Sequence, residues 1–175
     1  MARPSRNADP GSIRASARTF FATAKTSMGR RLLQSERNAL LLIDVLRSYV
    51  AQGRFQLHDF VIMPDHIHLL ITVDSGMSIE LAMQLVKGGF SYRLKKETGY
   101  LGEVWQRGFS EVRVEDSESW EQHRRYIAEN PIKAGLCTSP NQYPYCFQYL
   151  IEQKTRGLKP GSSSSRSSGT TEVVP

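Results

Sequence analysis

The sequence predicts an α+β fold in which an antiparallel β-sheet carries helices on its faces. Segments with strand-like and helix-like patterns follow one another in the order strand, helix, strand, strand, helix, strand, helix. Only a Pro64-Asp65 turn separates the two middle strands, which indicates a hairpin and therefore antiparallel pairing. A chain of 175 residues is long enough for one domain with a core and too short for two comfortable ones.

The first two elements are a strand and a helix. Residues 18–26, RTFFATAKT, are rich in aromatic and Thr side chains, which favours a strand. Residues 35–53 place apolar side chains at helical spacing. We expect Ser35 to cap the start of this helix and Gly53 to close it.

The predicted hairpin and the second helix follow. Residues 55–63 and 66–73 are apolar stretches of strand length on either side of the turn. Residues 78–99 have a helical pattern, and we expect Ser78 to cap its start and Gly99 to stop it.

The last two elements complete the order. Residues 104–114, VWQRGFSEVRV, predict a fourth strand, and residues 116–131 predict a third helix. This helix is expected to end at Pro131, because proline disfavours helical geometry at the preceding Asn130. The order β-α-β-β-α-β plus a helix predicts a ferredoxin-like sheet, with two helices on one face and the third free to lie near the other.

The composition limits the location and the domain boundaries. We expect one domain over residues 18–152, a flexible basic arm over 1–17 and a disordered Ser/Gly-rich tail over 153–175. The two cysteines, Cys137 and Cys146, are too few for a disulfide scaffold and predict a reducing compartment. No apolar run reaches the roughly 20 residues that span a bilayer, and the N-terminus has no secretory pattern. A cytoplasmic protein is expected.

The formal net charge of +6 permits an acidic partner such as nucleic acid. Residues 1–31 hold seven Lys and Arg against one acid, Asp9, and this segment accounts for the whole excess. The charge therefore indicates a basic arm and proves little about the domain.

Two histidines stand at the spacing of metal ligands. Successive side chains of a strand point to opposite faces, so His66 and His68 share one face of the strand 66–73. The apolar residues that share the other face are Ile67, Leu69, Ile71 and Val73. Neutral imidazoles suit several divalent ions, but a pair alone does not complete a site. Taken alone, the pair is more often incidental.

The third helix offers a complement to this pair. Tyr126 and Asn130 lie four residues apart and share a helix face. A tyrosine can act as a covalent nucleophile, and an Asn carbonyl oxygen can bind a divalent cation. The alternative is structural, with Tyr126 in an amphipathic core and Asn130 as a helix cap before Pro131.

Four separated segments favour the functional interpretation of these residues over the structural one. In chain order they are MPDHIHLLITV, VKGGFSYRLKKETG, VWQRGFSEVRV and HRRYIAENPIKAGL. In this order and spacing they resemble the REP-associated tyrosine transposases, which belong to the single-tyrosine branch of the HUH (His-hydrophobic-His) nucleases. The resemblance covers residues 18–149, nearly the whole expected domain.

The resemblance implies a role for each residue of the candidate site. His66, His68 and Asn130 match the family's positions for a divalent metal, Mg²⁺ or Mn²⁺, and Tyr126 matches its nucleophile. Similar enzymes cut single-stranded DNA that carries a hairpin, through a 5′-phosphotyrosine with release of a 3′-OH. A cation stabilises the charge that builds on the phosphate oxygens, and the covalent intermediate conserves the bond energy for rejoining.

Basic side chains supply expected DNA contacts. They are Lys87, Arg93, Lys95, Lys96, Arg107, Arg124 and Arg125. Arg124 and Arg125 are also candidates for favouring the phenolate of Tyr126. Tyr92 is the rival nucleophile, but the RRYIAENP segment favours Tyr126.

Several other residues have both a functional and a structural interpretation. Base stacking or core packing could explain the aromatic side chains, which are Trp105, Phe109 and Trp120. Close approach to DNA or tight helix packing could explain Gly88 and Gly89. Asp65 and His58 lie close to the histidine pair in the sequence, and we expect them to hydrogen-bond to its imidazoles.

Two other functions remain open. A replication or plasmid-relaxation HUH endonuclease would use the same chemistry but usually needs further domains. A catalytically idle nucleic-acid-binding module would not need His66, His68 and Tyr126 together. The expected partner is single-stranded or hairpin DNA, with the protein acting as a monomer or homodimer.

Overall fold

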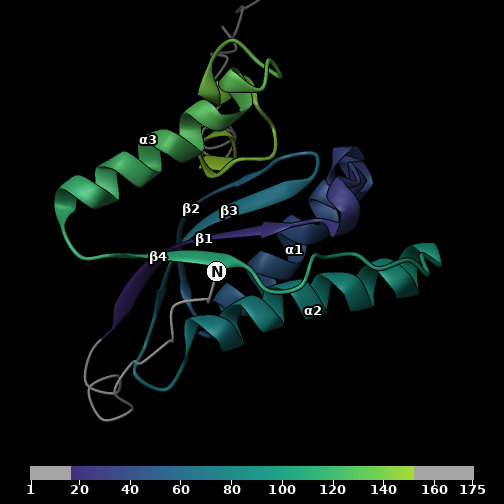
Figure 1. Cartoon of the computed structure of the whole chain (residues 1–175), viewed down its shortest axis with the longest axis horizontal. Coiled ribbons are helices and arrows are strands. Elements are labelled where there is room, and N and C mark those ends of the chain that lie inside the picture. The colour runs from purple at the N-terminus through teal and green to yellow at the C-terminus, as the bar shows by residue number, and fades with distance from the viewer. Residues whose placement is uncertain (1–16, 152–175) are drawn as a thin grey trace, which may run out of the picture.

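The computed structural model describes residues 17–151 (Figure 1). Its main elements are β1 (Arg18–Lys25), α1 (Glu36–Ala51), β2 (Gln56–Ile62), β3 (His66–Val73), α2 (Ile79–Thr98), β4 (Ser110–Val114) and α3 (Ser117–Lys133). Short 3₁₀ turns lie at Ser27–Gly29, Leu32–Gln34 and Pro140–Gln142. The expected N-terminal arm, apart from Ala17, and the expected C-terminal tail lie outside the described residues.

The four strands form one antiparallel sheet in the order β2-β3-β1-β4. This order confirms the ferredoxin-like α+β prediction, because the two halves of the chain interleave with β1 and β3 at the centre. The central register pairs Thr23 with His68 and Lys25 with His66. The histidine pair thus lies on a central strand, next to β1.

Two hydrophobic cores sandwich the sheet. The first core lies between the sheet and the helices α1 and α2, and it contains the β3 residues Ile67, Leu69, Ile71 and Val73. The second core lies between the other face and α3, and its members are Val61, Met63, Leu70, Val114, Ile127, Tyr143 and Cys146. Figure 1 shows α3 on one side of the sheet and α1 with α2 on the other. The predicted alternation of β3 is therefore confirmed, and the histidine side faces α3.

The ends of the first two helices largely follow the expected signals. Ser78 accepts a hydrogen bond from the Leu81 backbone N–H at 3.1 Å, and Gly99 closes α2 in the left-handed region at φ 71°. Ser35 occupies the capping position of α1, but its side chain makes no capping hydrogen bond. Ser35 thus occupies the expected N-cap position without making the expected hydrogen bond.

The predicted fourth strand is shorter than residues 104–114. The ladder begins only at Ser110, because Gly108 turns the chain with φ 71°. Before this turn, Trp105 is buried in the first core and its indole N–H donates to the Lys87 carbonyl at 3.0 Å. Trp105 still forms an isolated antiparallel bridge with Thr26 just beyond β1, and the turn at Gly108 separates this bridge from the ladder of β4.

The prediction that the third helix ends at Pro131 is wrong. The helix continues to Lys133, with Pro131 buried inside it, and it ends where Gly135 takes φ 69°. Proline removes one N–H and disfavours helical geometry before it, yet burial of its ring outweighs this local preference. This extension includes Lys133 in the helix, on the same face as Tyr126.

The adjacent glycines of α2 give a matched test of helix packing. A Cβ on Gly89 would lie 2.8 Å from the Tyr49 hydroxyl oxygen and 3.2 Å from Cγ1 of Val45, whereas a Cβ on Gly88 meets no atom within 4 Å. We expect Gly88→Ala to raise the free energy of unfolding by up to about 1 kcal/mol through helix propensity. Overpacking should make Gly89→Ala about 2 kcal/mol less stable than Gly88→Ala. Urea unfolding of both variants measures this, and equal stabilities would contradict it.

Candidate active site

In both histidines of β3 the Nδ1 atom has a hydrogen-bonding partner. Nδ1 of His66 lies 2.7 Å from Oδ1 of Asp65, and Nδ1 of His68 lies 2.7 Å from Oγ1 of Thr23. The two imidazole centroids are 4.8 Å apart. A carboxylate or hydroxyl at Nδ1 fixes ring orientation and directs the lone pair of Nε2 outward, as in metal-binding histidines. The expected support by Asp65 is confirmed as a hydrogen bond.

Nε2 of His68 is buried and has no hydrogen-bond partner within residues 17–151. Burial, together with the nearby His66 and Lys25, lowers the pKa of His68 to about 3. The ring is therefore neutral at ordinary pH, and in the tautomer whose Nδ1 donates to Thr23 the buried Nε2 has a free lone pair. A divalent metal fits this arrangement, because it would bind the unpartnered atom.

Helix α3 places a tyrosine and an amide beside this pair. The Tyr126 ring centroid lies 5.2 Å from that of His68, with the ring planes at 77°. A cavity of about 540 Å³ brings together His66, Tyr126 and Asn130, with Arg31 and Lys133 also in its wall. Within the described chain no three His, Cys, Asp or Glu side chains could hold a metal, so the amide oxygen of Asn130 is the candidate third ligand.

Three contributors to the site were missed at the sequence level. Thr23 supports His68, Phe21 stacks on the His68 ring at 5.2 Å, and Nζ of Lys133 lies 5.8 Å from the Tyr126 ring centroid. Phe21 and Thr23 alternate on β1, so their shared face could have been noted. Nothing in the local pattern says that this face meets α3.

The rival nucleophile Tyr92 lies on the opposite side of the sheet. It belongs to α2, is 65% exposed, and borders a small cavity with Tyr49 and Arg93. Because the sheet separates α2 from the histidine face, Tyr92 cannot reach the same phosphate as His66 and His68. The geometry favours Tyr126.

The expected DNA contacts on α2 already have protein partners. Lys87 donates to the backbone carbonyls of Gln106 and Gly108 at 2.9 and 2.6 Å, which anchors the segment before β4. Burial lowers the pKa of this amine. Arg93 pairs with Glu97 at 2.8 Å.

Three further basic side chains are exposed on α2 or on the segment before β4. Lys96 lies over the Tyr92 ring, Lys95 lies in the last turn of α2, and Arg107 is exposed before β4. Contacts of these basic residues with DNA stay predictions.

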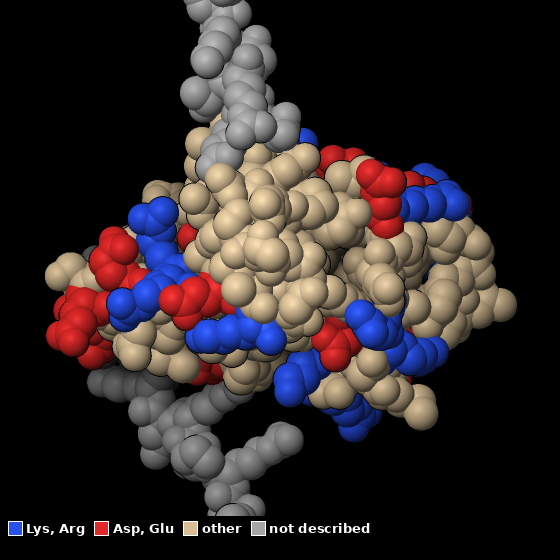
Figure 2. Space-filling model, turned by 90° about the horizontal axis from the view of Figure 1, so that it is seen from above, with Lys and Arg blue, Asp and Glu red and all other residues tan. Residues whose placement is uncertain are grey.

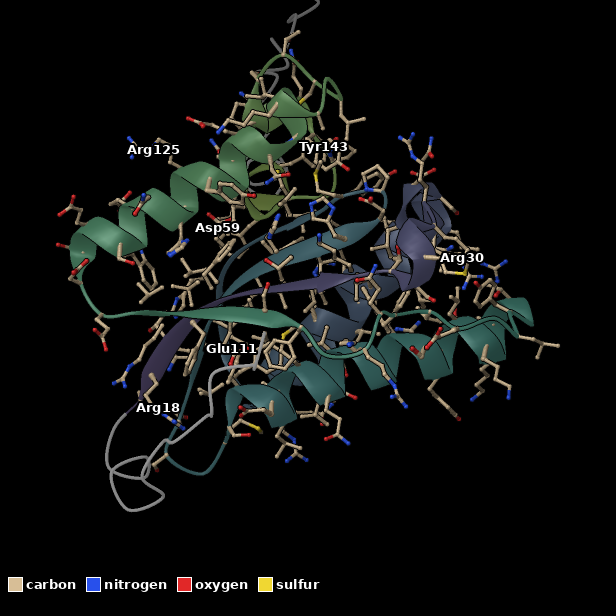
Figure 3. All side chains as sticks on the ribbon, in the orientation of Figure 1. Arg18, Arg30, Asp59, Glu111, Arg125 and Tyr143 are labelled. Atoms are coloured by element: carbon tan, nitrogen blue, oxygen red, sulfur yellow. The ribbon has the colours of Figure 1, made fainter. Side chains whose placement is uncertain are left out.

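Arg124 and Arg125 occupy different environments on α3. The Arg124 guanidinium lies 3.5 Å from the carboxylate of Asp59 on β2. Arg125 is exposed and borders a shallow cavity with Glu118 and Glu121 (Figure 3). For Tyr126, the cation observed over the ring is Lys133.

The structural explanation holds for the aromatic side chains. Trp105 is a member of the first core, Phe109 packs against that core, and Trp120 packs against the second core. Trp120 also contacts His58, whose Nε2 lies 2.7 Å from Oγ1 of Thr72. The expectation that His58 supports the histidine pair is therefore wrong, since this bond lies at the far end of β3.

Asp59 and His68 oppose each other in the pH dependence of stability. Burial raises the pKa of Asp59 to about 6, although the Phe60 N–H and Arg124 partly offset this rise. Its contribution to stability falls as the pH rises from 3.8 to about 6, whereas that of His68 falls as the pH drops from 6.5 to about 3.

We therefore expect the free energy of unfolding to fall more steeply with decreasing pH in Asp59→Asn than in the wild type. Between pH 6.5 and 4.5 the variant should lose about 2 kcal/mol more unfolding free energy than the wild type. Urea unfolding at the two pH values tests this, with the exposed Asp44→Asn as control. If the wild type and Asp59→Asn lose the same unfolding free energy between the two pH values, the burial of the Asp59 carboxylate is contradicted.

The charged surface is mixed over the face that Figure 2 shows. Blue and red groups lie side by side at the left, and blue groups gather toward the lower right edge. Among the helices that the structure describes, none is long and apolar enough to cross a membrane.

Fold and site together define a class of protein. A ferredoxin-like sheet that presents paired histidines to a tyrosine on the helix after the fourth strand is the arrangement of single-tyrosine HUH transposases. The family described as "Transposase IS200 like" matches residues 24–130, more than half of the chain, and the chain belongs to this family. By family it is a tyrosine transposase, an enzyme of DNA transposition, and such transposases are generally metal-dependent.

Individual relatives agree with this assignment. The REP-associated tyrosine transposase of Escherichia coli (strain K12) is 27% identical over 149 residues, which cover 81% of this chain and 82% of that protein. A Haemophilus influenzae protein assigned to the same type is 32% identical over 96 residues, so the match spans 48% of this chain and 53% of that relative.

A solved structure agrees in fold. The REP-associated tyrosine transposase bound to a REP hairpin aligns over 99% of this chain and 100% of that chain, with a TM-score of 0.65 and 22% identity. At this identity the likeness shows the fold.

Proposed function

We propose that the protein cuts and rejoins single-stranded DNA that carries a hairpin, with Tyr126 as the nucleophile. The observation that carries this proposal is the placement of Tyr126 in one cavity with His66 and Asn130, beside the His68 ring. The hairpin substrate is suggested by the relative whose structure contains a REP hairpin. The proposal includes action in the cytoplasm, the location expected from the sequence.

The chemistry follows from the residues of the cavity. The phenol oxygen of Tyr126 attacks the scissile phosphorus, the bond from phosphorus to the 3′ oxygen breaks, and a 5′-phosphotyrosine forms. The phenol proton is lost and the departing 3′ oxygen gains one, so the step is balanced and reversible. Attack by a 3′-OH on the phosphotyrosine rejoins the strand.

His66, His68 and Asn130 would hold a divalent cation, and we propose Mg²⁺ or Mn²⁺. A bound cation would supply electrostatic stabilisation of the negative charge on the phosphate oxygens. The amide oxygen of Asn130 suits such ions, the two imidazoles also suit Zn²⁺ and other transition metals, and no thiolate is present to select a soft metal.

Cleavage of labelled oligonucleotides tests the proposal. Single-stranded hairpins from the flanks of the gene would be incubated with the full chain and Mn²⁺ or Mg²⁺, or with chelator. We expect metal-dependent cutting and a protein–DNA adduct that survives denaturation. Tight, salt-sensitive binding without cutting under any condition would instead indicate an idle binding module.

Lys133 is positioned to stabilise charge at Tyr126. Its Nζ lies over the phenol ring and also pairs with Glu129 at 2.8 Å. We expect Lys133→Met to lower the cleavage rate about 5-fold, the loss of a cation contact worth roughly 1 kcal/mol. Single-turnover rates measure this, and Arg113→Met, which removes an exposed cation of β4 that pairs with Glu115, is the control. Equal rates in the two variants would contradict the role of Lys133.

A further inference from the structure

Three aromatic rings from three elements form a continuous stack beside the candidate nucleophile. The Phe21 ring of β1 lies 5.2 Å from the His68 ring, with the planes at 19°, and 4.4 Å from the His123 ring, with the planes at 13°. Phe21 is therefore sandwiched between an imidazole of the central sheet and an imidazole of α3.

Tyr126 lies one turn after His123 and contacts the same stack with its ring. Its ring centroid lies 5.7 Å from that of Phe21, with the planes at 90°, and 5.2 Å from that of His68. The side chain is 43% exposed, and its contacts among the described residues are those of its ring with Phe21, His68 and Lys133. The direction of the phenol is thus set by ring contacts, which are directional because aromatic edges prefer aromatic faces.

We propose that Phe21 is a positioning residue that fixes the phenol of Tyr126 relative to the ring of His68. It contacts both rings directly, and through His123 it holds the preceding turn of α3 against β1. The inference rests on the proposed function insofar as Tyr126 is the nucleophile. An aliphatic side chain could fill the volume of Phe21, but it would not provide a flat face for three rings.

The neighbouring Phe20 provides a matched control. It lies on the same strand but packs into the first core on the opposite face of the sheet, with 8% of its surface exposed. Phe20→Leu therefore disturbs packing without touching the stack, whereas Phe21→Leu disturbs the stack. Phe21→Tyr keeps the aromatic ring and serves as the conservative variant.

Cleavage kinetics of the full chain form the first arm of the test. We expect Phe21→Leu to lower kcat about 10- to 100-fold with little change in KM, because displacement of a reacting group by about 1 Å has effects of this size. Phe21→Tyr should restore kcat to within a few-fold of wild type. Equal losses in Phe20→Leu and Phe21→Leu, or an unchanged kcat in Phe21→Leu, would overturn the proposal. Should Phe21→Leu not fold, Phe21→Met takes its place.

Tyrosine resonances form a second arm that needs no cleavage. In protein carrying ¹³C-labelled tyrosine, the Tyr126 ring signals are assigned by their loss in Tyr126→Phe. Phe21→Leu should move these signals toward those of an exposed tyrosine, and Phe20→Leu should not. If the wild type fails to cut DNA while this shift is seen, the proposed function fails and the positioning role stands. Unmoved signals would overturn the positioning role.

Discussion

Tyr126→Phe is expected to eliminate both cleavage and the covalent protein–DNA adduct, a loss of at least about 10³-fold in rate. Phenylalanine keeps the ring that contacts Phe21 and His68 but lacks the oxygen that would attack phosphorus. Because the side chain is 43% exposed, the variant should fold with nearly the wild-type thermal midpoint. Denaturing gels with end-labelled hairpin DNA would quantify product and adduct.

Tyr92→Phe is the control for this substitution. Tyr92 lies on α2, across the sheet from the histidine pair, so its variant should cut at the wild-type rate. An adduct that persists in Tyr126→Phe and disappears in Tyr92→Phe would show that the second helix carries the nucleophile. That result would also contradict the site assigned around His66.

His68→Ala is expected to weaken Mn²⁺ binding at least about 100-fold, since it would remove a proposed direct ligand rather than a supporting contact. The buried and unpartnered Nε2 of His68 is the atom that the substitution deletes. Isothermal titration with Mn²⁺ alone measures the affinity without DNA. Thr23→Val should lower the affinity less, because it removes only the hydroxyl that orients the ring.

His58→Ala is the matched histidine control. His58 lies on β2 and bonds Thr72, so its loss should leave Mn²⁺ affinity unchanged. Since burial lowers the pKa of His68 to about 3, its protonation should not weaken binding between pH 5 and 8. Full Mn²⁺ affinity in His68→Ala would contradict the assigned centre.

Local periodicity was sufficient to predict most of the fold. The strand alternation of residues 66–73 placed the apolar side chains on one face and the histidines on the other, as observed. Ser78 and Gly99 marked the ends of α2 because capping depends on neighbouring backbone groups. The short hairpin turn and the order of elements then led to the ferredoxin-like layout, whose strand order the structure supplies.

Local preference failed where packing opposed it. The run 104–114 has strand-forming side chains, but burial of Trp105 against α2 and the turn at Gly108 confine β4 to its last five residues. Pro131 disfavours the helix that contains it, yet its burial in the second half of α3 outweighs that preference. Such effects depend on residues distant in the sequence.

The sequence by itself determined which side chains share a face: His66 with His68 on one strand, and Tyr126 with Asn130 on one helix. Only the tertiary structure decided that these two faces meet and that Phe21 contacts both His68 and Tyr126. The reason is that a face is set by the periods of strand and helix, over a few residues. Contacts between segments some 50 residues apart depend on strand register and on how α3 packs over the sheet.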